Sequence, residues 1–388
     1  MKIGIDVNSI LFDQSGIGHY SLNIVKNLLL VDTANEYVLC ADNFLQKKLE
    51  RQKILQSLVK NAKNHKVSVK IIPLPPKVKD WLIGTPYFYP NLVQEKFDIY
   101  FSPHFTTTPK NGFSQTVTTI HDVIFLKNPE YWPAALSRYY SKRLKMAVNS
   151  SKKIIAVSEA TKNDLIHLLK VPKEKIKVVY EGVTPSFHRI IDKKTLLNKT
   201  AQYLNPDTKF ILSVGTLEPR KNLPAVVKAF ALLPNEIRNQ YKIVFVGGKG
   251  WQNEELNQTI NDLNLRNKVI FTGFVPDDDL PYIYNRASIF VYPSKAEGFG
   301  LPVLEAMACG VPVITSNNSS LPEVMGKAGV LIDPKNEKEI AQAIKNILLK
   351  PKLGEKMSLE GIKQAKKFSW VIAAKQTLKV FEEINREN

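Results

Sequence analysis

Residues 210–222 read Phe-Ile-Leu-Ser-Val-Gly-Thr-Leu-Glu-Pro-Arg-Lys-Asn and contain a complete strand-to-turn transition. The apolar run over 210–214 is typical of a buried strand, and Gly215 permits a tight turn directly after it. Two adjacent cations, Arg220 and Lys221, then stand just before an expected helix. Ligands in open α/β sheets bind at the carboxyl ends of the strands, so this turn predicts an anion site.

A diphosphate is the anion that suits this turn. A cation about 4 Å from a phosphate oxygen contributes roughly 4 kcal/mol at an effective dielectric of about 20, which favours the departure of a nucleoside diphosphate. The alternative is an ordinary pair of surface cations at a helix start. Because the pair follows a buried strand, we favour the phosphate site.

Apolar runs of strand length recur on both sides of this segment and fall into two series. Helical or loop-like stretches separate the runs, and this alternation indicates parallel, doubly wound sheets. The first series is expected at 2–7, 37–40, 67–72, 99–101, 117–120, 154–157 and 178–180. After the first of these strands we expect a turn at Gly16–Gly18 and a helix over about 19–30. The second series is expected at 210–214, 243–246, 269–271, 289–292 and 313–315. The predicted fold is α/β, with two Rossmann-like domains that face each other across a cleft.

The length of 388 residues exceeds what one ordinary core supports, which favours two domains. We expect an N-terminal domain over 1–190, a C-terminal domain over 191–370, and a C-terminal helix over 371–388. One arrangement that the sequence allows is that this last helix packs back on the first domain. Residues 73–98 are rich in Pro, Tyr and Trp and predict an irregular insertion with a helix.

The composition is that of a soluble globular protein, with 44% apolar and 23% charged residues. No apolar run approaches the roughly 18 residues that span a bilayer, and residues 1–7 predict a strand rather than a signal peptide. A cytoplasmic location is therefore expected. The two cysteines, Cys40 and Cys309, lie in apolar stretches and are expected to be core thiols.

The formal net charge of +18 is concentrated in the first half of the chain, where 27 Lys and Arg stand against 15 Asp and Glu. Such a field attracts polyanions, but no nucleic-acid-binding motif is present in the sequence. Residues 136–146 mix cations with aromatic and apolar residues at helical spacing, as a helix at an anionic membrane surface does. The alternative, which we favour, is a surface helix with one buried stripe and a solvated basic face.

A second motif, Glu297-Gly-Phe-Gly-Leu-Pro-Val-Leu-Glu305, places two carboxylates on either side of an expected helix start. Pro302 suits the first helical position, and Gly298 and Gly300 let the preceding backbone approach a bulky ligand. Helix-start N–H groups attract phosphate, which leaves Glu297 and Glu305 to bind hydroxyl groups of a sugar nucleotide. The alternative places Glu305 at the positive helix end and Glu297 in solvent.

Polar residues follow other expected strands. His121 ends an apolar run, where it could bond a sugar hydroxyl, stabilise positive charge through its carbonyl, or be structural. Ser158 is a candidate helix cap. Asp277-Asp-Asp279 contains an Asp-x-Asp pattern that metal sites use, but its position favours helix capping. No metal site is predicted.

Several of these motifs together resemble one family: Gly16-Ile-Gly18, Ile120-His-Asp122, Ala156-Val-Ser-Glu159, Gly215 to Asn222, and Glu297 to Val313. The chain is similar to retaining glycosyltransferases of the GT-B fold, glycosyltransferase family 4 or "glycosyl transferases group 1", which include bacterial polysaccharide mannosyltransferases. The resemblance spans nearly the whole chain and is densest over 210–323.

The resemblance implies a role for each matching residue. His121 and Glu297 are the expected catalytic residues, with Glu297 on the donor sugar and His121 facing it from the other domain. Donor binding is expected from Gly16, Gly18, Arg220, Lys221, Gly298, Phe299, Gly300, Leu301 and Glu305. Arg220 and Lys221 would hold the diphosphate, and Glu305 the ribose. Many relatives carry an arginine where this chain has Thr216, so Arg220 is the expected substitute.

The resemblance also implies an activity. It is the metal-independent, retaining transfer of a hexose to a saccharide or polyprenyl-linked acceptor in surface-polysaccharide synthesis, without a cofactor. Mannose from GDP-mannose is the expected donor, in preference to a UDP-sugar. The expected partners exclude nucleic acid and include the cytoplasmic membrane face as a peripheral contact. The alternatives are a sugar-nucleotide epimerase or hydrolase of the same fold, and a basic nucleic-acid- or lipid-binding protein with a relict site.

Overall fold

The computed structural model describes residues 1–12, 16–42, 48–63, 66–72, 93–110, 113, 115–248, 250 and 254–387. The chain divides into two compact units, one of residues 1–182 with 369–388 and one of residues 183–368. The predicted boundary after residue 190 thus falls inside the second unit, and the C-terminal segment belongs to the first. Residues 73–92 of the predicted insertion lie outside the described residues.

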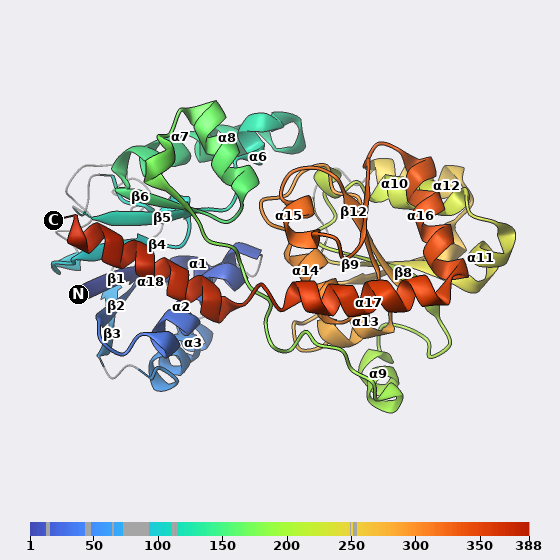
Figure 1. The fold of residues 1–388 in the computed structure, drawn as a ribbon, viewed down its shortest axis with the longest axis horizontal. Coiled ribbons are helices and arrows are strands. Elements are labelled where there is room, and N and C mark those ends of the chain that lie inside the picture. Colours follow the sequence, from blue (N-terminus) through green and yellow to red (C-terminus); the bar gives the residue numbers. More distant parts are fainter. Residues whose placement is uncertain are drawn as a thin grey trace. The chain divides into compact units, whose positions relative to one another are not determined.

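In the described part of the first unit, seven parallel strands form one sheet in the order β3-β2-β1-β4-β5-β6-β7 (Figure 1). The strands are β1 Lys2–Asp6, β2 Glu36–Asp42, β3 Val67–Ile72, β4 Ile99–Ser102, β5 Thr116–Ile120, β6 Lys153–Ala156 and β7 Ile176–Val178. The helices are α1 Asn8–Phe12, α2 Gly16–Val31, α3 Lys48–Lys60, α6 Ile124–Lys127, α7 Ala134–Ser150, α8 Glu159–Leu169 and α18 Trp370–Arg386, with 3-10 turns at Phe105–Thr107, Pro129–Tyr131 and Lys173–Lys175.

In the described part of the second unit, six parallel strands have the order β10-β9-β8-β11-β12-β13. The strands are β8 Lys209–Val214, β9 Tyr241–Val246, β10 Val269–Gly273, β11 Ile289–Tyr292, β12 Val313–Ser316 and β13 Val330–Ile332. The helices are α9 Lys193–Thr200, α10 Leu223–Ala231, α11 Asn235–Gln240, α12 Glu254–Asp262, α13 Leu280–Arg286, α14 Leu301–Ala308, α15 Leu321–Met325, α16 Glu337–Leu349 and α17 Pro351–Ala365, with 3-10 turns at Pro219–Lys221 and Arg266–Lys268.

Both sheets confirm the prediction of two Rossmann-like, doubly wound folds. Central strands such as β8 and β11 are buried apolar runs, because parallel sheets are covered by helices on both faces. The strand order reverses between β1 and β4 in the first unit and between β8 and β11 in the second. Such a switch point opens a crevice at the carboxyl ends of the strands, where ligands bind.

Two local predictions need correction. The predicted turn at Gly16–Gly18 is the first turn of α2, so the glycines begin the helix instead of preceding it. Val330–Ile332, which was not among the predicted strands, forms the edge strand β13 beside β12. Cys40 and Cys309 are buried and form no disulfide with each other, as predicted.

The C-terminal helix α18 packs along α2 in the first unit (Figure 1). The rings of Phe101 on β4 and Phe381 on α18 meet edge to face with centroids 5.3 Å apart. Glu383 of α18 also pairs with Lys177 of β7 at 2.8 Å. These contacts join the last helix to the sheet of the first unit.

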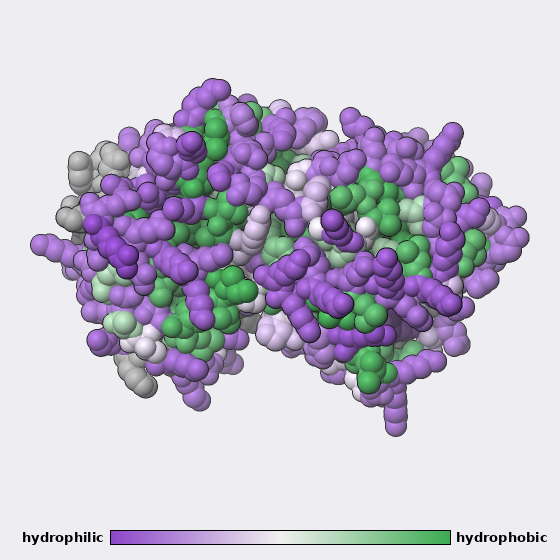
Figure 2. Space-filling model, in the orientation of Figure 1, coloured by the Kyte–Doolittle hydropathy of each residue, from purple (hydrophilic) through white to green (hydrophobic). Residues whose placement is uncertain are grey.

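The visible face of the molecule is mainly hydrophilic, with smaller hydrophobic areas between the polar side chains (Figure 2). Among the described residues, no helix combines the length and the apolar character that crossing a bilayer requires.

Candidate functional site

The turn after β8 is held in one conformation. Gly215 has φ +142°, a value that side-chain-bearing residues rarely adopt, and its amide donates to Val246 O at 2.9 Å. Asn222 lies in the left-handed region with φ +56°, directly before α10. Its side-chain amide donates to the carbonyls of Pro293 at 3.1 Å and Pro334 at 2.7 Å. The two cations between these residues therefore start from a fixed backbone.

Glu297 lies at the centre of a buried polar cluster with these cations. Its Oε1 accepts from Lys221 Nζ at 2.8 Å, from Tyr292 OH at 2.8 Å and from Ser294 Oγ at 2.6 Å. Its Oε2 accepts from an Arg220 guanidinium nitrogen at 2.6 Å. The side chain of Glu297 is only 8% exposed, so the alternative that placed it in solvent is wrong.

The charges of this cluster fix the protonation of Glu297. Burial by itself raises the pKa of a carboxyl group, but the Arg220 and Lys221 charges outweigh it and lower the pKa of Glu297 to about 2. Burial, with the neighbouring Arg220 charge, lowers the pKa of the Lys221 ammonium. Glu297 is therefore an anion at neutral pH, and it is bound by two cations whose side chains have little solvent exposure.

Arg220 is bound on both sides. Its Nε lies 2.6 Å from a carboxylate oxygen of Glu218, and its guanidinium also donates to the Ala296 carbonyl at 3.1 Å. The backbone carbonyl of Arg220 accepts from the Lys295 amide at 2.7 Å and from Ser294 Oγ at 3.0 Å. These bonds join the turn after β8 to the loop after β11, on the two sides of the switch point.

The glycine-rich loop before α14 is held by two serines. Ser320 Oγ donates to the carbonyls of Glu297 at 3.1 Å and Phe299 at 2.7 Å, and the Glu297 amide donates to Ser319 Oγ at 3.1 Å. Gly300 has φ +116°, and a Cβ there would lie 2.8 Å from Leu321. Only glycine fits this position, and Leu301 then begins α14.

Glu305 lies in the middle of α14 and is half-buried. Its Oε2 accepts from Tyr284 OH at 2.9 Å. Burial raises the pKa of Tyr284, as it raises that of Tyr292, so both hydroxyls stay protonated donors. The ring of Phe290 lies between them, 5.5 Å from Tyr284 and 5.6 Å from Tyr292. Glu305 and Glu297 thus each accept a hydrogen bond from a buried tyrosine, and the two tyrosine rings pack on either side of Phe290.

His121 lies directly after β5 in the first unit, as predicted, and is buried. Its Nδ1 lies 3.3 Å from Glu181 Oε1, and its Nε2 lies 3.0 Å from the Pro103 carbonyl oxygen. The His121 carbonyl accepts from Thr161 Oγ1 at 3.0 Å. A carbonyl oxygen has two lone pairs, so this bond leaves one for a ligand.

The other predicted positions have simpler outcomes. Gly16 and Gly18 lie in the first turn of α2, where N–H groups have no partner within the helix. Ser158 caps α8 by accepting from the Thr161 amide, as anticipated. Asp279 stands before α13, but its side chain makes no cap and instead accepts from Tyr203 OH at 2.9 Å, so the capping prediction is wrong for Asp279. Among the described residues, no group of three His, Cys, Asp or Glu is arranged to hold a metal ion.

Comparison with known proteins identifies the family. The family model described as Glycosyltransferase Family 4 matches residues 18–187, and the model described as Glycosyl transferases group 1 matches residues 197–364. The chain is 33% identical to the O-antigen chain mannosyltransferase B of Escherichia coli, over 98% of this chain and 100% of that relative. The chain is a family 4 glycosyltransferase.

Solved structures agree on the fold of this glycosyltransferase. A sucrose-phosphate synthase from Thermosynechococcus elongatus matches with a TM-score of 0.78 at 19% identity, covering 100% of both chains. HepE of Anabaena, in complex with UDP and glucose, matches with a TM-score of 0.72 at 19% identity, over 99% of this chain and 100% of that one. At this identity the likeness establishes the GT-B fold alone.

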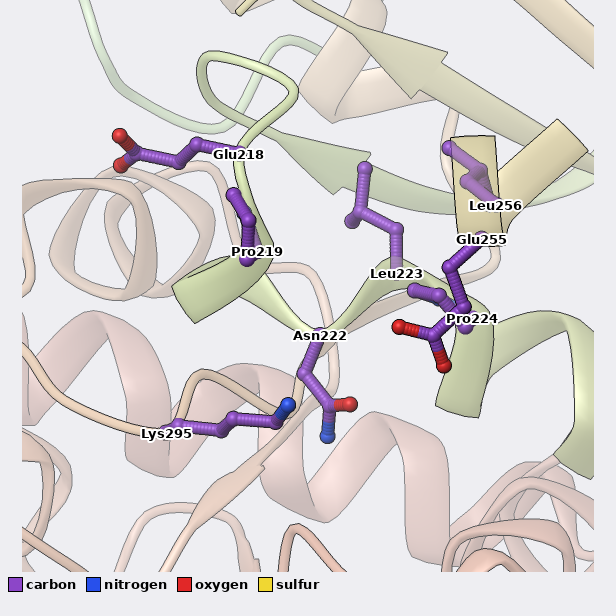
Figure 3. A pocket seen from close by; sticks show the side chains of 8 residues that line it. All are labelled: Glu218, Pro219, Asn222, Leu223, Pro224, Glu255, Leu256 and Lys295. Carbon is purple, nitrogen blue, oxygen red and sulfur yellow. The ribbon is translucent and has the colours of Figure 1, made fainter. Parts of the chain in front are cut away.

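The glycosyltransferase also has a pocket beside the cation turn. Figure 3 shows the lining side chains, which are Glu218, Pro219, Asn222, Leu223, Pro224, Glu255, Leu256 and Lys295. Arg220 and Lys221 do not line it, because their side chains are directed to Glu297. In this view the Glu218 carboxylate points away from the other labelled polar groups. The pocket borders the cation cluster and shares Glu218 with it, since Glu218 also pairs with Arg220.

Sequence reasoning missed the residues that hold the predicted ones. Tyr284, Tyr292 and Ser294 bond the two carboxylates, and Ser319 with Ser320 fixes the glycine-rich loop. Ser294 lies two residues after the end of β11, so its place near the carboxyl end of a buried strand was a signal that could have found it.

Proposed function

We propose that this glycosyltransferase moves mannose from GDP-mannose to a saccharide or polyprenyl-linked saccharide acceptor in the synthesis of a surface polysaccharide. The observation that carries the proposal is the near full-length similarity to an O-antigen chain mannosyltransferase. The buried cluster of Arg220, Lys221 and Glu297 at the switch point of the second unit supports it, since such a crevice binds nucleotides.

Arg220 and Lys221 are proposed to bind the diphosphate of the donor. Both cations are already desolvated and paired with Glu297, so they are held in place before the donor arrives. Fixed cations in a site with little water stabilise the charge of a leaving diphosphate without reorganisation at the moment of reaction. This is the reason for proposing a reaction without a metal ion.

Glu297 and Glu305 are proposed to bind hydroxyl groups, Glu297 those of the sugar and Glu305 those of the ribose. The low pKa of Glu297 suits this role, because a carboxylate that stays ionised accepts hydrogen bonds and gives no proton. The amides of Gly298 to Leu301, at the start of α14, and those of Gly16 and Gly18, at the start of α2, would contact the phosphates.

The proposed chemistry is a front-side displacement with retention. The bond from the anomeric carbon to the diphosphate oxygen breaks as the bond to the acceptor oxygen forms. The acceptor proton passes to the departing phosphate oxygen, which leaves GDP and the mannosylated acceptor. His121 is proposed to contact the donor sugar from the first unit. Most of the rate enhancement would come from positioning and charge stabilisation.

The proposed place of action is the cytoplasmic face of a membrane. Helix α7 contains no acidic residue, and Arg138, Lys142 and Lys145 are exposed on it beside Tyr139. Basic residues near an anionic surface contribute about 1 kcal/mol each, so this face would favour peripheral contact. Sedimentation with vesicles of phosphatidylglycerol should carry down the wild type more than K142E/K145E; equal sedimentation of the two proteins would remove α7 from the proposal.

One assay tests the donor and the reaction class. The enzyme is incubated with GDP-mannose or UDP-glucose, with and without octyl α-mannoside and synthetic polyprenyl-diphosphate sugars. We expect GDP release from GDP-mannose that depends on an acceptor and survives EDTA, and an α-linked product by NMR. Turnover of the donor alone would indicate an epimerase or hydrolase, and transfer only from UDP-glucose would overturn the donor assignment.

A further inference from the structure

A buried polar cluster surrounds His121 in the first unit and includes a carboxylate that the proposed function does not use. Glu181 is 5% exposed, and its Oε1 lies 3.3 Å from His121 Nδ1. The opposite ring nitrogen, Nε2, lies 3.0 Å from the Pro103 carbonyl oxygen. A carbonyl only accepts, so Nε2 carries a hydrogen in this arrangement. A ring flip would break both contacts at once.

Two aromatic rings pack against His121 and limit its movement. Tyr20 of α2 meets it edge to face with centroids 4.5 Å apart, and the Tyr20 hydroxyl bonds to Thr119 Oγ1 at 3.0 Å. His104 lies 5.8 Å away. Burial, with the neighbouring His121, lowers the pKa of His104 to about 3, so His104 is uncharged at neutral pH. The Glu181 carboxyl group thus meets the His121 ring beside two rings that are uncharged at neutral pH.

The backbone beside Glu181 is fixed as well. Gly182, the next residue, is the last one of this segment in the first unit. A Cβ at Gly182 would lie 2.2 Å from the Trp370 backbone nitrogen, so the chain here is in close contact with the start of α18. Trp370 in turn packs against Tyr20, with ring centroids 5.7 Å apart. Glu181 therefore approaches His121 from a rigid position.

We propose that Glu181 is a positioning residue that orients the His121 ring toward the donor sugar. The Glu181 carboxylate contacts Nδ1 of His121 and so fixes the orientation of the ring. It acts only through His121. This inference rests on the proposed function, in which His121 contacts the sugar. Because the cations and carboxylates assigned to the nucleotide lie in the second unit, loss of Glu181 should affect the chemical step more than the affinity for the nucleotide.

Steady-state kinetics of Glu181→Gln provide the first test. With GDP-mannose and the acceptor that the wild type uses best, we expect kcat to fall at least tenfold and KM for GDP-mannose to change less than about twofold. Glu174→Gln is the matched control, since Glu174 is exposed on the same unit, and it should keep the wild-type kcat. An unchanged kcat in Glu181→Gln would overturn the proposal.

A double-variant cycle tests whether Glu181 acts through His121. The single variant His121→Ala and the double variant His121→Ala/Glu181→Gln should have the same kcat. Glu181 acts only through the His121 ring, and His121→Ala has already removed that ring. If the double variant shows the product of the kcat losses of the two single variants, the positioning role is contradicted.

A readout without turnover separates this inference from the proposed function. In protein labelled with ¹⁵N-histidine, Glu181→Gln and Glu181→Asp should shift the His121 ring resonances, assigned by their loss in His121→Asn, while Glu174→Gln leaves them in place. If the wild type transfers no mannose, the proposed function fails and the spectra still decide the role of Glu181. If the His121 resonances do not move in a folded Glu181 variant, the positioning role fails alone.

Discussion

Lys221 Nζ and Glu297 Oε1 lie 2.8 Å apart, and both side chains are 8% exposed. The two residues are 76 positions apart in the chain and come from the loops after β8 and β11. Removing one partner of such a buried pair leaves an uncompensated charge and costs about 3–5 kcal/mol. The cluster is thus both a ligand site and a part of the fold.

Glu297→Gln should therefore lower the free energy of unfolding by about 3 kcal/mol at pH 7, measured by urea denaturation. In Glu297→Gln/Lys221→Met, the loss should be smaller than the sum of the two single losses, because the charge left behind is removed as well. Glu255→Gln, whose side chain is 69% exposed, is the control and should change stability by less than about 0.5 kcal/mol. Additive single losses would contradict the coupling.

The same carboxylate should make stability depend on pH in acid. Its pKa is lowered from 4.5 to about 2 in the folded protein, so its stabilisation is complete above pH 4.5 and is lost as the pH falls toward 2. The shift corresponds to about 3 kcal/mol. Between pH 5 and 2, the unfolding free energy of the wild type should fall more steeply than that of Glu297→Gln. Parallel pH profiles of the two proteins would contradict the assigned pKa.

Asn222 should separate backbone strain from side-chain bonding. Asn222→Ala loses both amide bonds and places alanine at φ +56°, whereas Asn222→Gly loses the bonds but fits the backbone. A left-handed conformation costs an alanine about 1 kcal/mol, so the alanine variant should be the less stable one by that amount in urea. Equal stabilities would show that the turn relaxes.

Glu305 offers a test of ribose recognition. Glu305→Gln should weaken the binding of GDP about tenfold by calorimetry, since a hydrogen bond to a charged group contributes about 1.5–3 kcal/mol. The same variant should bind 2′,3′-dideoxy-GDP as the wild type does, because the hydroxyls that the carboxylate would accept from are absent. If Glu305→Gln weakened the binding of both nucleotides equally, Glu305 would not act through the ribose hydroxyls.

The fold followed from the sequence because buried parallel strands are continuous apolar runs that local composition reveals. Both strand series were found, with differences at their ends. The edge strand Val330–Ile332 was missed because it is short and only partly buried, so its composition differs little from that of a loop. Gly16–Gly18 was assigned to a turn because glycine usually breaks helices, but α2 begins at Gly16.

The site was predictable as a set of motifs but not as a geometry. Arg220 and Lys221 were identified from their position after a strand, and Glu297 from the glycine-rich motif before an expected helix. That Glu297 accepts from both cations depends on loops 76 and 77 positions apart in the chain, which no local pattern encodes. The roles of Tyr292 and Tyr284 depend in the same way on packing, because a buried tyrosine looks like any other core aromatic in the sequence.

The most direct measurement of the central claim is the dissociation constant of GDP for the wild type and Arg220→Met. The account predicts at least tenfold weaker binding in Arg220→Met, from the lost charge on the diphosphate, with Lys295→Met in the adjacent pocket binding GDP as the wild type does. GDP binding of equal strength in Arg220→Met and the wild type would contradict the claim that this cation cluster is the donor diphosphate site.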